Sequence, residues 1–298
     1  MMILPIVQSV LQQNPEHSGF ENVIEKEIFH HDIISALHQS GFLENLTFIG
    51  GTSLRMCHGW NRLSEDLDFN GGIDFTPEKF SSLANVVSDT LSKKYMLDIS
   101  VAQPKPMEGD TATWRASIEK NAAKPGGAKQ KIHIDICRYK TINPIMKTTM
   151  NFYPFKSPIE GLPIPCQSLD EILVDKIIVF AMREYSNRVV KPRDLWDITF
   201  LNNRHIKLDN NVLMQKLVQR GIGFDLFFDR TISNLNSVNV NEEIKLDFHR
   251  EMSRFVLPEL AKNTLENEHF WGVVKNAVAE VVSSIENPND APRTPSER

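Results

Sequence analysis

Two aspartates, Asp66 and Asp68, have the residue type and spacing best suited to chemistry in this chain of 298 residues. They alternate with Leu67 and Phe69, and in a β-strand this places both carboxylates on one face and both apolar side chains on the other. Aspartate is disfavoured in strands, and two carboxylates on one face repel each other, so the pair requires a compensating cation. Because Mg²⁺ prefers carboxylate oxygens, we predict that Asp66 and Asp68 bind magnesium. The alternative is a pair of solvent-facing strand or turn residues.

A glycine-containing turn precedes this pair. An apolar run ending at Ile49 leads into Gly50, Gly51, Thr52 and Ser53, which is the pattern of a strand, a tight turn and a helix start. Glycine lets the backbone approach a ligand closely, and the first N–H groups of a helix are available to an anion. We therefore predict that this turn binds the phosphates of a nucleoside triphosphate. The alternative is an ordinary turn in which Thr52 or Ser53 caps the helix.

A later segment, residues 131–137, has the alternation of a strand. Ile132, Ile134 and Ile136 fall on one face, which we predict to be the core face. Asp135 therefore lies on the opposite face, together with His133.

Lys176 falls on the otherwise apolar stripe of a helix that we predict from residue 169 to residue 184. Ser168 and Glu171, at its start, have the spacing of a capping box. A lysine on such a stripe, or an arginine such as Arg183, is costly unless it has an anionic partner or reaches water.

A further aspartate, Asp194, lies in the first turn of the next predicted helix, which Pro192 begins. A carboxylate in that position is stabilised by the helix dipole, so its role can be purely structural. It can also act as a general base, provided that its proton affinity is tuned to the reaction. Asp197, one turn later, is predicted to form a structural ion pair with an arginine.

Together these segments resemble the AbiEii/MenT-type toxins of the polymerase-β-like nucleotidyltransferase superfamily. The resemblance covers residues 23–198 and rests on Val-Ile-Glu-Lys-Glu from Val23, Gly-Gly-Thr-Ser-Leu from Gly50, Arg-x-Ser-Glu-Asp-Leu-Asp-Phe from Arg62, and the segments around Lys176 and from Arg193. It implies an α/β fold, with a polymerase-β-like core of a mixed sheet and flanking helices followed by a helical C-terminal half.

The resemblance also implies roles for individual residues. Catalysis would depend on three aspartates and a lysine: Asp66, Asp68, Asp194 and Lys176. The nucleotide would be bound by the turn and the same lysine, that is by Gly50, Gly51, Thr52, Ser53 and Lys176. Magnesium would be the cofactor, and Asp135 would join Asp66 and Asp68 as a third metal ligand. Apart from the resemblance, Arg55 and Arg62 lie close enough to the turn in the sequence to assist in nucleotide binding at the phosphates. Single arginines are more often solvated, and that alternative stands for both.

The activity implied by the resemblance is transfer of a nucleoside monophosphate from a nucleoside triphosphate to an acceptor, with release of pyrophosphate. The acceptor would be the 3′ end of a tRNA, so that translation is blocked, and a cognate antitoxin protein would be a partner. The alternatives are nucleotidyl or phosphoryl transfer to a protein or small-molecule hydroxyl, and a non-catalytic regulator that binds a nucleoside triphosphate.

Basic residues that could contact an RNA backbone occur in two places. Arg183, Arg188, Lys191 and Arg193 lie close together in the sequence, and residues 120–131 contain four lysines. Contacts of this kind weaken with salt. Solvation is the alternative, especially for the lysines, and the net charge of −5 argues against a basic surface over the whole protein.

The chain is long enough for two compact parts. We predict a nucleotidyltransferase core over residues 1–160 and a helical domain over 161–285, because five prolines make residues 141–166 irregular and so mark a boundary. Residues 286–298 have the proline, polar and charged content of a disordered tail. Helices are predicted at 21–43, 76–94, 169–184, 193–202, 209–219, 224–235, 242–255 and 258–285. No apolar run is long enough to cross a membrane, no signal peptide is recognised and the three cysteines are scattered, so we expect a cytoplasmic protein.

Overall fold

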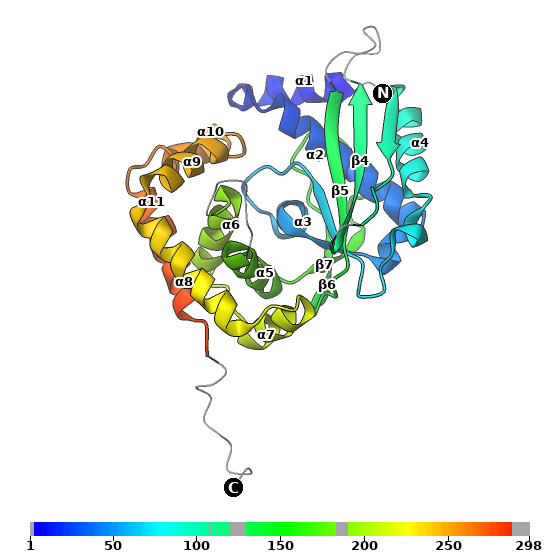
Figure 1. Cartoon of the computed structure of the whole chain (residues 1–298). Helices are drawn as coiled ribbons and strands as arrows, with labels where there is room; N and C mark the ends of the chain where they lie inside the picture. The colour runs from blue at the N-terminus through cyan, green and yellow to red at the C-terminus, as the bar shows by residue number, and fades with distance from the viewer. Residues whose placement is uncertain (1–2, 108, 120–128, 183–189, 288–298) are drawn as a thin grey trace. The chain divides into compact units, whose positions relative to one another are not determined.

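The computed structural model describes residues 3–107, 109–119, 129–182 and 190–287. They form two compact units (Figure 1). The first unit comprises Met1–Ser168 and Ser253–Glu266, and the second comprises Leu169–Met252 and Asn267–Arg298.

A mixed seven-stranded sheet forms the centre of the first unit, with strand order β3-β4-β5-β2-β1-β7-β6. The pairs β2–β5 and β1–β7 are parallel, and the other neighbours are antiparallel. This confirms the predicted α/β class. The strands are β1 Thr47–Ile49, β2 Leu67–Asn70, β3 Ile99–Ala102, β4 Thr111–Glu119, β5 Lys129–Cys137, β6 Pro144–Thr148 and β7 Pro163–Gln167.

One face of this sheet is apolar. In β4 and β5, every second residue is buried, and helices α2 (Glu21–Gln39) and α4 (Leu83–Tyr95) pack on that side (Figure 1). Phe48 of β1 stacks on Phe69 of β2 within the same core, with 5.1 Å between ring centroids. Burial of these side chains stabilises the sheet, because apolar area leaves water. The alternate residues of β4 and β5 consequently lie on the opposite face.

The remaining helices of the first unit are short or terminal: α1 Ile3–Gln13, α3 Gly50–His58, α10 Pro258–Asn263, and the 3-10 turns η1 Pro15–His17, η2 Phe42–Asn45 and η3 Pro77–Phe80.

The structure differs from the sequence-based prediction in three segments. The helix predicted from residue 76 is a 3-10 turn followed by α4. The helix predicted over 258–285 is two helices, α10 and α11, because Thr264 at the end of α10 leaves helical geometry. Residues 141–166 contain strands β6 and β7 rather than irregular chain alone; β6 begins at Pro144 on the edge of the sheet, where a missing N–H needs no partner.

The second unit is built from helices in the part that the structure describes: α5 Leu169–Met182, α6 Pro192–Asn203, α7 Asn210–Gln219, α8 Phe224–Val240, α9 Glu242–Met252 and α11 Phe270–Ser283. Trp196 of α6 is buried and packs against Phe200, Phe248 and Phe270. The helical C-terminal half is thus confirmed.

The capping box predicted for α5 is not formed. The Ser168 hydroxyl is buried and has no hydrogen-bond partner among the described residues. Glu171 instead forms a buried ion pair with Lys216 of α7, with 2.7 Å between Oε1 and Nζ. Lys216 also donates to Asp175 at 2.8 Å, so these charges tie α5 to α7. Asp209, in contrast, caps α7 through the N–H groups of residues 211 and 212.

Helix α2 of the first unit carries two buried histidines. Burial lowers the pKa of His30 to about 3 and that of His31 to about 4. His30 donates from Nε2 to the Glu65 carbonyl at 3.1 Å, and His31 forms a hydrogen bond of 2.7 Å with the Ser157 hydroxyl. Both imidazoles are therefore neutral in the folded protein at neutral pH.

We predict that this burial makes the protein sensitive to acid. Since both folded pKa values lie below the ordinary value of about 6.5, the unfolded chain binds more protons, and stability is lost as the pH falls below 6.5. The two histidines together lower the free energy of unfolding by about 4 kcal/mol between pH 7 and pH 5. Urea unfolding at both pH values measures this loss.

The matched variants are His30→Gln, whose amide can still donate to Glu65, and His269→Gln on an exposed residue. His30→Gln should remove about half of the histidine contribution, while His269→Gln should leave it unchanged. Equal pH dependence in all three proteins would contradict the prediction.

Candidate active site

The turn between β1 and α3 brings the main chain against the Asp68 carboxylate. Ile49, the last residue of β1, is in register with Asp68 of β2, so Gly50 follows directly beside it. Gly50 has a φ of +74°, and a Cβ in its place would overlap the Asp68 carboxylate oxygen Oδ2. Glycine is thus required both by the left-handed backbone and by the close approach.

The neighbouring positions of the turn are also tightly packed. A Cβ on Gly51 would come within 2.5 Å of Nη2 of Arg62, and Arg62 is buried with Nη1 donating to the Leu63 carbonyl at 3.1 Å. Thr52 and Ser53 are fully buried, and the Thr52 hydroxyl donates to the Asp66 carbonyl and forms a second hydrogen bond with the Ser64 hydroxyl. The groups that remain for an anion are the backbone N–H groups at the start of α3, which have no acceptor within the helix.

The carboxylates of the site come from two adjacent parallel strands. Asp68 of β2 is in register with Asp135 of β5, so both side chains lie on the same face of the sheet. Asp66 accepts a hydrogen bond from the His133 backbone N–H at 3.0 Å, and its Oδ1 is 3.5 Å from Nδ1 of His133. Burial raises the pKa of Asp135, and Asp66 contributes to this while a hydrogen bond from Thr113 opposes it.

These residues have the chemistry of a magnesium site. Asp135 Oδ1 is buried and has no hydrogen-bond partner among the described residues, so this oxygen is available to coordinate a cation. Within the described ranges, no group of three or more acidic, histidine or cysteine side chains converges as a metal site. Mg²⁺, however, is commonly held by one or two carboxylates together with water and substrate phosphates, so the donors present fit it.

Arg55 is buried in the first unit and is therefore not the solvated surface residue that the sequence analysis gave as an alternative. Its Nε donates to Glu27 of α2 at 3.2 Å, its Nη1 donates to the Trp60 carbonyl at 2.8 Å, and its guanidinium covers the Phe152 ring. Glu27 also accepts from the Ser64 N–H at 3.0 Å. This ion pair ties α2 and α3 to the chain just before the carboxylates.

In the second unit, Lys176 is held between two aspartates of α6. Its Nζ lies 2.7 Å from Asp194 Oδ1 and 2.7 Å from Asp197 Oδ2. All three side chains are largely or fully buried, with exposed fractions of 13%, 6% and 0%. The structure thus brings Lys176 and Asp194 together and supplies the anionic partner that a lysine on an apolar stripe needs.

The same geometry gives Asp197 a basic partner that the sequence did not predict, namely Lys176. Arg193, one turn before Asp197, pairs with Glu251 of α9 at 3.1 Å. Asp197 is three residues from Asp194 on one helix, and this i, i+3 spacing was the signal that both face one partner.

The structure describes only some of the residues that we predicted to bind RNA. Of the predicted RNA-binding residues, Lys191 directly precedes α6 and Arg193 lies in its first turn, whereas Arg183 and Arg188 lie outside the described residues. The sequence missed His133 as a neighbour of Asp66, although its alternation with Asp135 placed it on the correct face.

A family model described as "Nucleotidyl transferase AbiEii toxin, Type IV TA system" matches residues 32–276. The chain belongs to this family. This confirms the resemblance seen in the motifs, and the AbiEii protein is accordingly a nucleotidyltransferase.

One solved structure supports the fold. The nucleotidyltransferase toxin MenT4 from Mycobacterium tuberculosis H37Rv matches with a TM-score of 0.57 and 13% identity, over 96% of this chain and 91% of that one. JHP933 from Helicobacter pylori matches with a TM-score of 0.49 and 16% identity, over 88% of this chain and 93% of that one. A search of curated protein sequences found no match. In the described part of the AbiEii protein, every helix is too short or too polar to cross a membrane.

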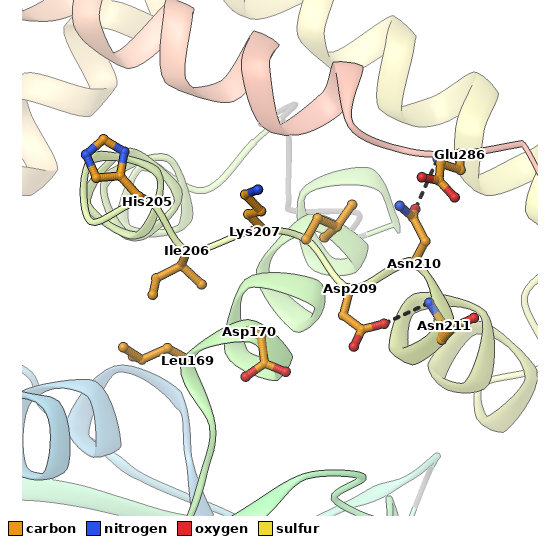
Figure 2. Close-up of a pocket in the computed structure, with 10 residues that line it drawn as sticks. Leu169, Asp170, His205, Ile206, Lys207, Asp209, Asn210, Asn211 and Glu286 are labelled. Carbon is orange, nitrogen blue, oxygen red and sulfur yellow. Dashed lines mark hydrogen bonds between the residues drawn. The ribbon is translucent and has the colours of Figure 1, made fainter.

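The second unit also contains a shallow polar pocket, with a volume of about 630 Å³ (Figure 2). Asp170, His205 and Lys207 line it, and Asn210 accepts a hydrogen bond from the Glu286 N–H at its rim. None of the residues predicted to bind nucleotide or metal lines this pocket. It therefore adds nothing to the candidate site.

We predict that Gly50→Ala inactivates the AbiEii protein without unfolding it. The added Cβ must displace the Asp68 carboxylate, and a misplacement of about 1 Å at a reacting centre costs on the order of 100-fold in rate. Pyrophosphate release from nucleoside triphosphates measures the effect.

Gly161→Ala is the matched control, because Gly161 has a φ of +75° but has nothing within 4 Å of the added Cβ. Both variants should lose about 1–2 kcal/mol of stability from the left-handed backbone. Equal activity of the two variants would show that the Asp68 position is not critical.

We also predict that Lys176→Met destabilises the protein by about 3 kcal/mol, because two buried carboxylates lose their cation. Urea unfolding at neutral pH measures the change. Lys207→Met, on an exposed lysine of the same unit, should change stability by less than about 0.5 kcal/mol. A stability of Lys176→Met equal to that of the control would contradict the buried charge arrangement.

Proposed function

We propose that this AbiEii protein is a magnesium-dependent toxin that transfers a nucleoside monophosphate to the 3′ end of a tRNA and so blocks translation. The observation that carries the proposal is the convergence of the glycine turn, Asp68 and Asp135 on one region of the sheet. Family membership, with its type IV toxin–antitoxin description, implies a nucleoside triphosphate substrate and an antitoxin partner.

In this proposal, the first unit binds the nucleotide. The N–H groups at Gly50 and Gly51 hold the terminal phosphates, and the buried Arg62 adds positive charge beneath the turn. One or two of the carboxylates of Asp66, Asp68 and Asp135, together with water and substrate phosphates, would hold Mg²⁺, which when bound supplies charge stabilisation at the transferred phosphoryl group.

The acceptor oxygen then forms a bond to the α-phosphorus, and the bond from that phosphorus to pyrophosphate breaks. We further propose catalytic roles for two residues of the second unit, with Asp194 as a general base and Lys176 as the residue that orients it through their ion pair. A buried lysine that pairs with two aspartates adds little to the free energy of unfolding, because apolar residues of similar volume in the same positions often give equal stability. This small contribution favours a chemical role.

The test combines the purified protein with each α-labelled nucleoside triphosphate, total tRNA and lysate protein. We expect label on the tRNA 3′ end, loss of label after chelation and recovery with added Mg²⁺. Asp68→Asn and Asp194→Asn should each reduce labelling by on the order of 10³-fold.

Asp89→Asn, which removes an exposed carboxylate on α4, is the matched control and should retain full activity. Label on protein instead of tRNA would establish the alternative acceptor class. Labelling that survives in Asp68→Asn would refute the assignment of the site.

A further inference from the structure

The strand order of the sheet separates the glycine turn from strands β4 and β5. Strand β2, with its carboxylates, lies between β1 on one side and β5 on the other, and β4 lies beyond β5. The turn follows β1. In the proposed site, the triphosphate is held between the turn after β1 and the carboxylates of β2 and β5, so the proposal has it extend across β2 with its α-phosphorus on the side of β5, where Asp135 lies.

The direction of attack follows from this placement. In phosphoryl and nucleotidyl transfer, the attacking and leaving oxygens lie roughly in line through the phosphorus. Pyrophosphate leaves toward the turn, so the acceptor hydroxyl must arrive from the opposite side. That side is the polar face of β5 and β4, where Asp135 lies.

This face is continuous and polar. The register pairs on it are Thr113 with Asp135, Arg115 with His133 and Ser117 with Lys131. They alternate with the buried residues of both strands and so point away from the core. The distance along β5 from Asp135 to Lys131 is about 13 Å, which accommodates a few nucleotides.

Two exposed cations, Arg115 and Lys131, lie on this face. Neither makes an ion pair among the residues that the structure describes. The neighbouring Lys129, by comparison, pairs with Glu119 at 3.3 Å. The charge of Arg115 can be explained as compensation for the nearby Asp135 carboxylate. This explanation does not extend to Lys131, which lies four residues from Asp135 along β5.

We propose that the polar face of β4 and β5 binds the acceptor as a single strand of RNA, with Arg115 and Lys131 on its phosphates and its terminal hydroxyl beside Asp135. The proposal rests on the proposed function and names the surface that the acceptor occupies. Charge complementarity favours RNA, since a protein acceptor would not present a phosphate at each successive position. Hydroxyls of Thr113 and Ser117 supply further donors to the backbone.

The test uses the full-length variant Arg115→Gln/Lys131→Gln. The control is Lys93→Gln/Lys105→Gln, which removes two exposed lysines elsewhere in the first unit. Three quantities are measured: the KM for tRNA, the KM for the nucleoside triphosphate, and the salt dependence of binding to a tRNA-derived single strand. Thermal unfolding establishes that both variants are folded.

We expect the KM for tRNA to rise by on the order of tenfold and the slope of log affinity against log salt to fall by about 1.4, because two phosphate contacts are lost. The KM for the nucleotide and all values for the control should match the wild type. Unchanged RNA parameters in the Arg115/Lys131 variant would overturn the inference, and so would an equal change in the control.

The outcome separates this inference from the proposed function. If wild type labels tRNA and the variant does so with the same KM for tRNA, only the proposed surface is wrong. If wild type labels a protein and binds no RNA, both proposals fail. A rise in the nucleotide KM without any change in RNA binding would assign Arg115 to Asp135 alone and overturn the RNA role.

Discussion

The close approach of the Gly50 main chain to the Asp68 carboxylate is the constraint on which the candidate site depends. It exists because β2 pairs with β1 on one side and with β5 on the other, so that one position of β2 faces the turn and Asp135 at once. A slip of one residue in either pairing would turn Asp68 into the core and Phe69 out of it. The Phe48–Phe69 stack on the buried face opposes such a slip, because it would expose both rings.

Buried charge is the second feature of this molecule, and it occurs in both units. Glu27 with Arg55 connects α2 to α3 in the first unit, and Lys216 with Glu171 and Asp175 connects α7 to α5 in the second. Desolvation makes such pairs costly, and removal of one partner leaves the other charge uncompensated. Each pair therefore specifies how helices meet more than it adds to stability. Both lie next to segments that carry site residues, namely the α3 turn and Lys176.

The family assignment and the fold agree although identity to the solved relatives is low. MenT4 shares 13% of residues and yet matches over nearly all of both chains. Such a likeness establishes the architecture, while chemistry must come from named side chains. In the AbiEii protein, these side chains are carboxylates of hard-metal type, a turn of backbone donors and a buried lysine.

The sequence by itself determined the local features of this protein. The alternation in Asp66–Phe69 placed the carboxylates on one face, the glycines marked the turn, and helical periodicity located α2, α5, α6 and α7, because these patterns depend on residues close together in the chain. Only the tertiary structure decided which distant segments meet. It paired Asp68 with Asp135, Lys176 with Asp197 and Arg55 with Glu27, and it placed Arg115 opposite His133. Strands β6 and β7 emerged in a proline-rich stretch for the same reason, since a strand is stabilised by neighbours that its own sequence does not contain.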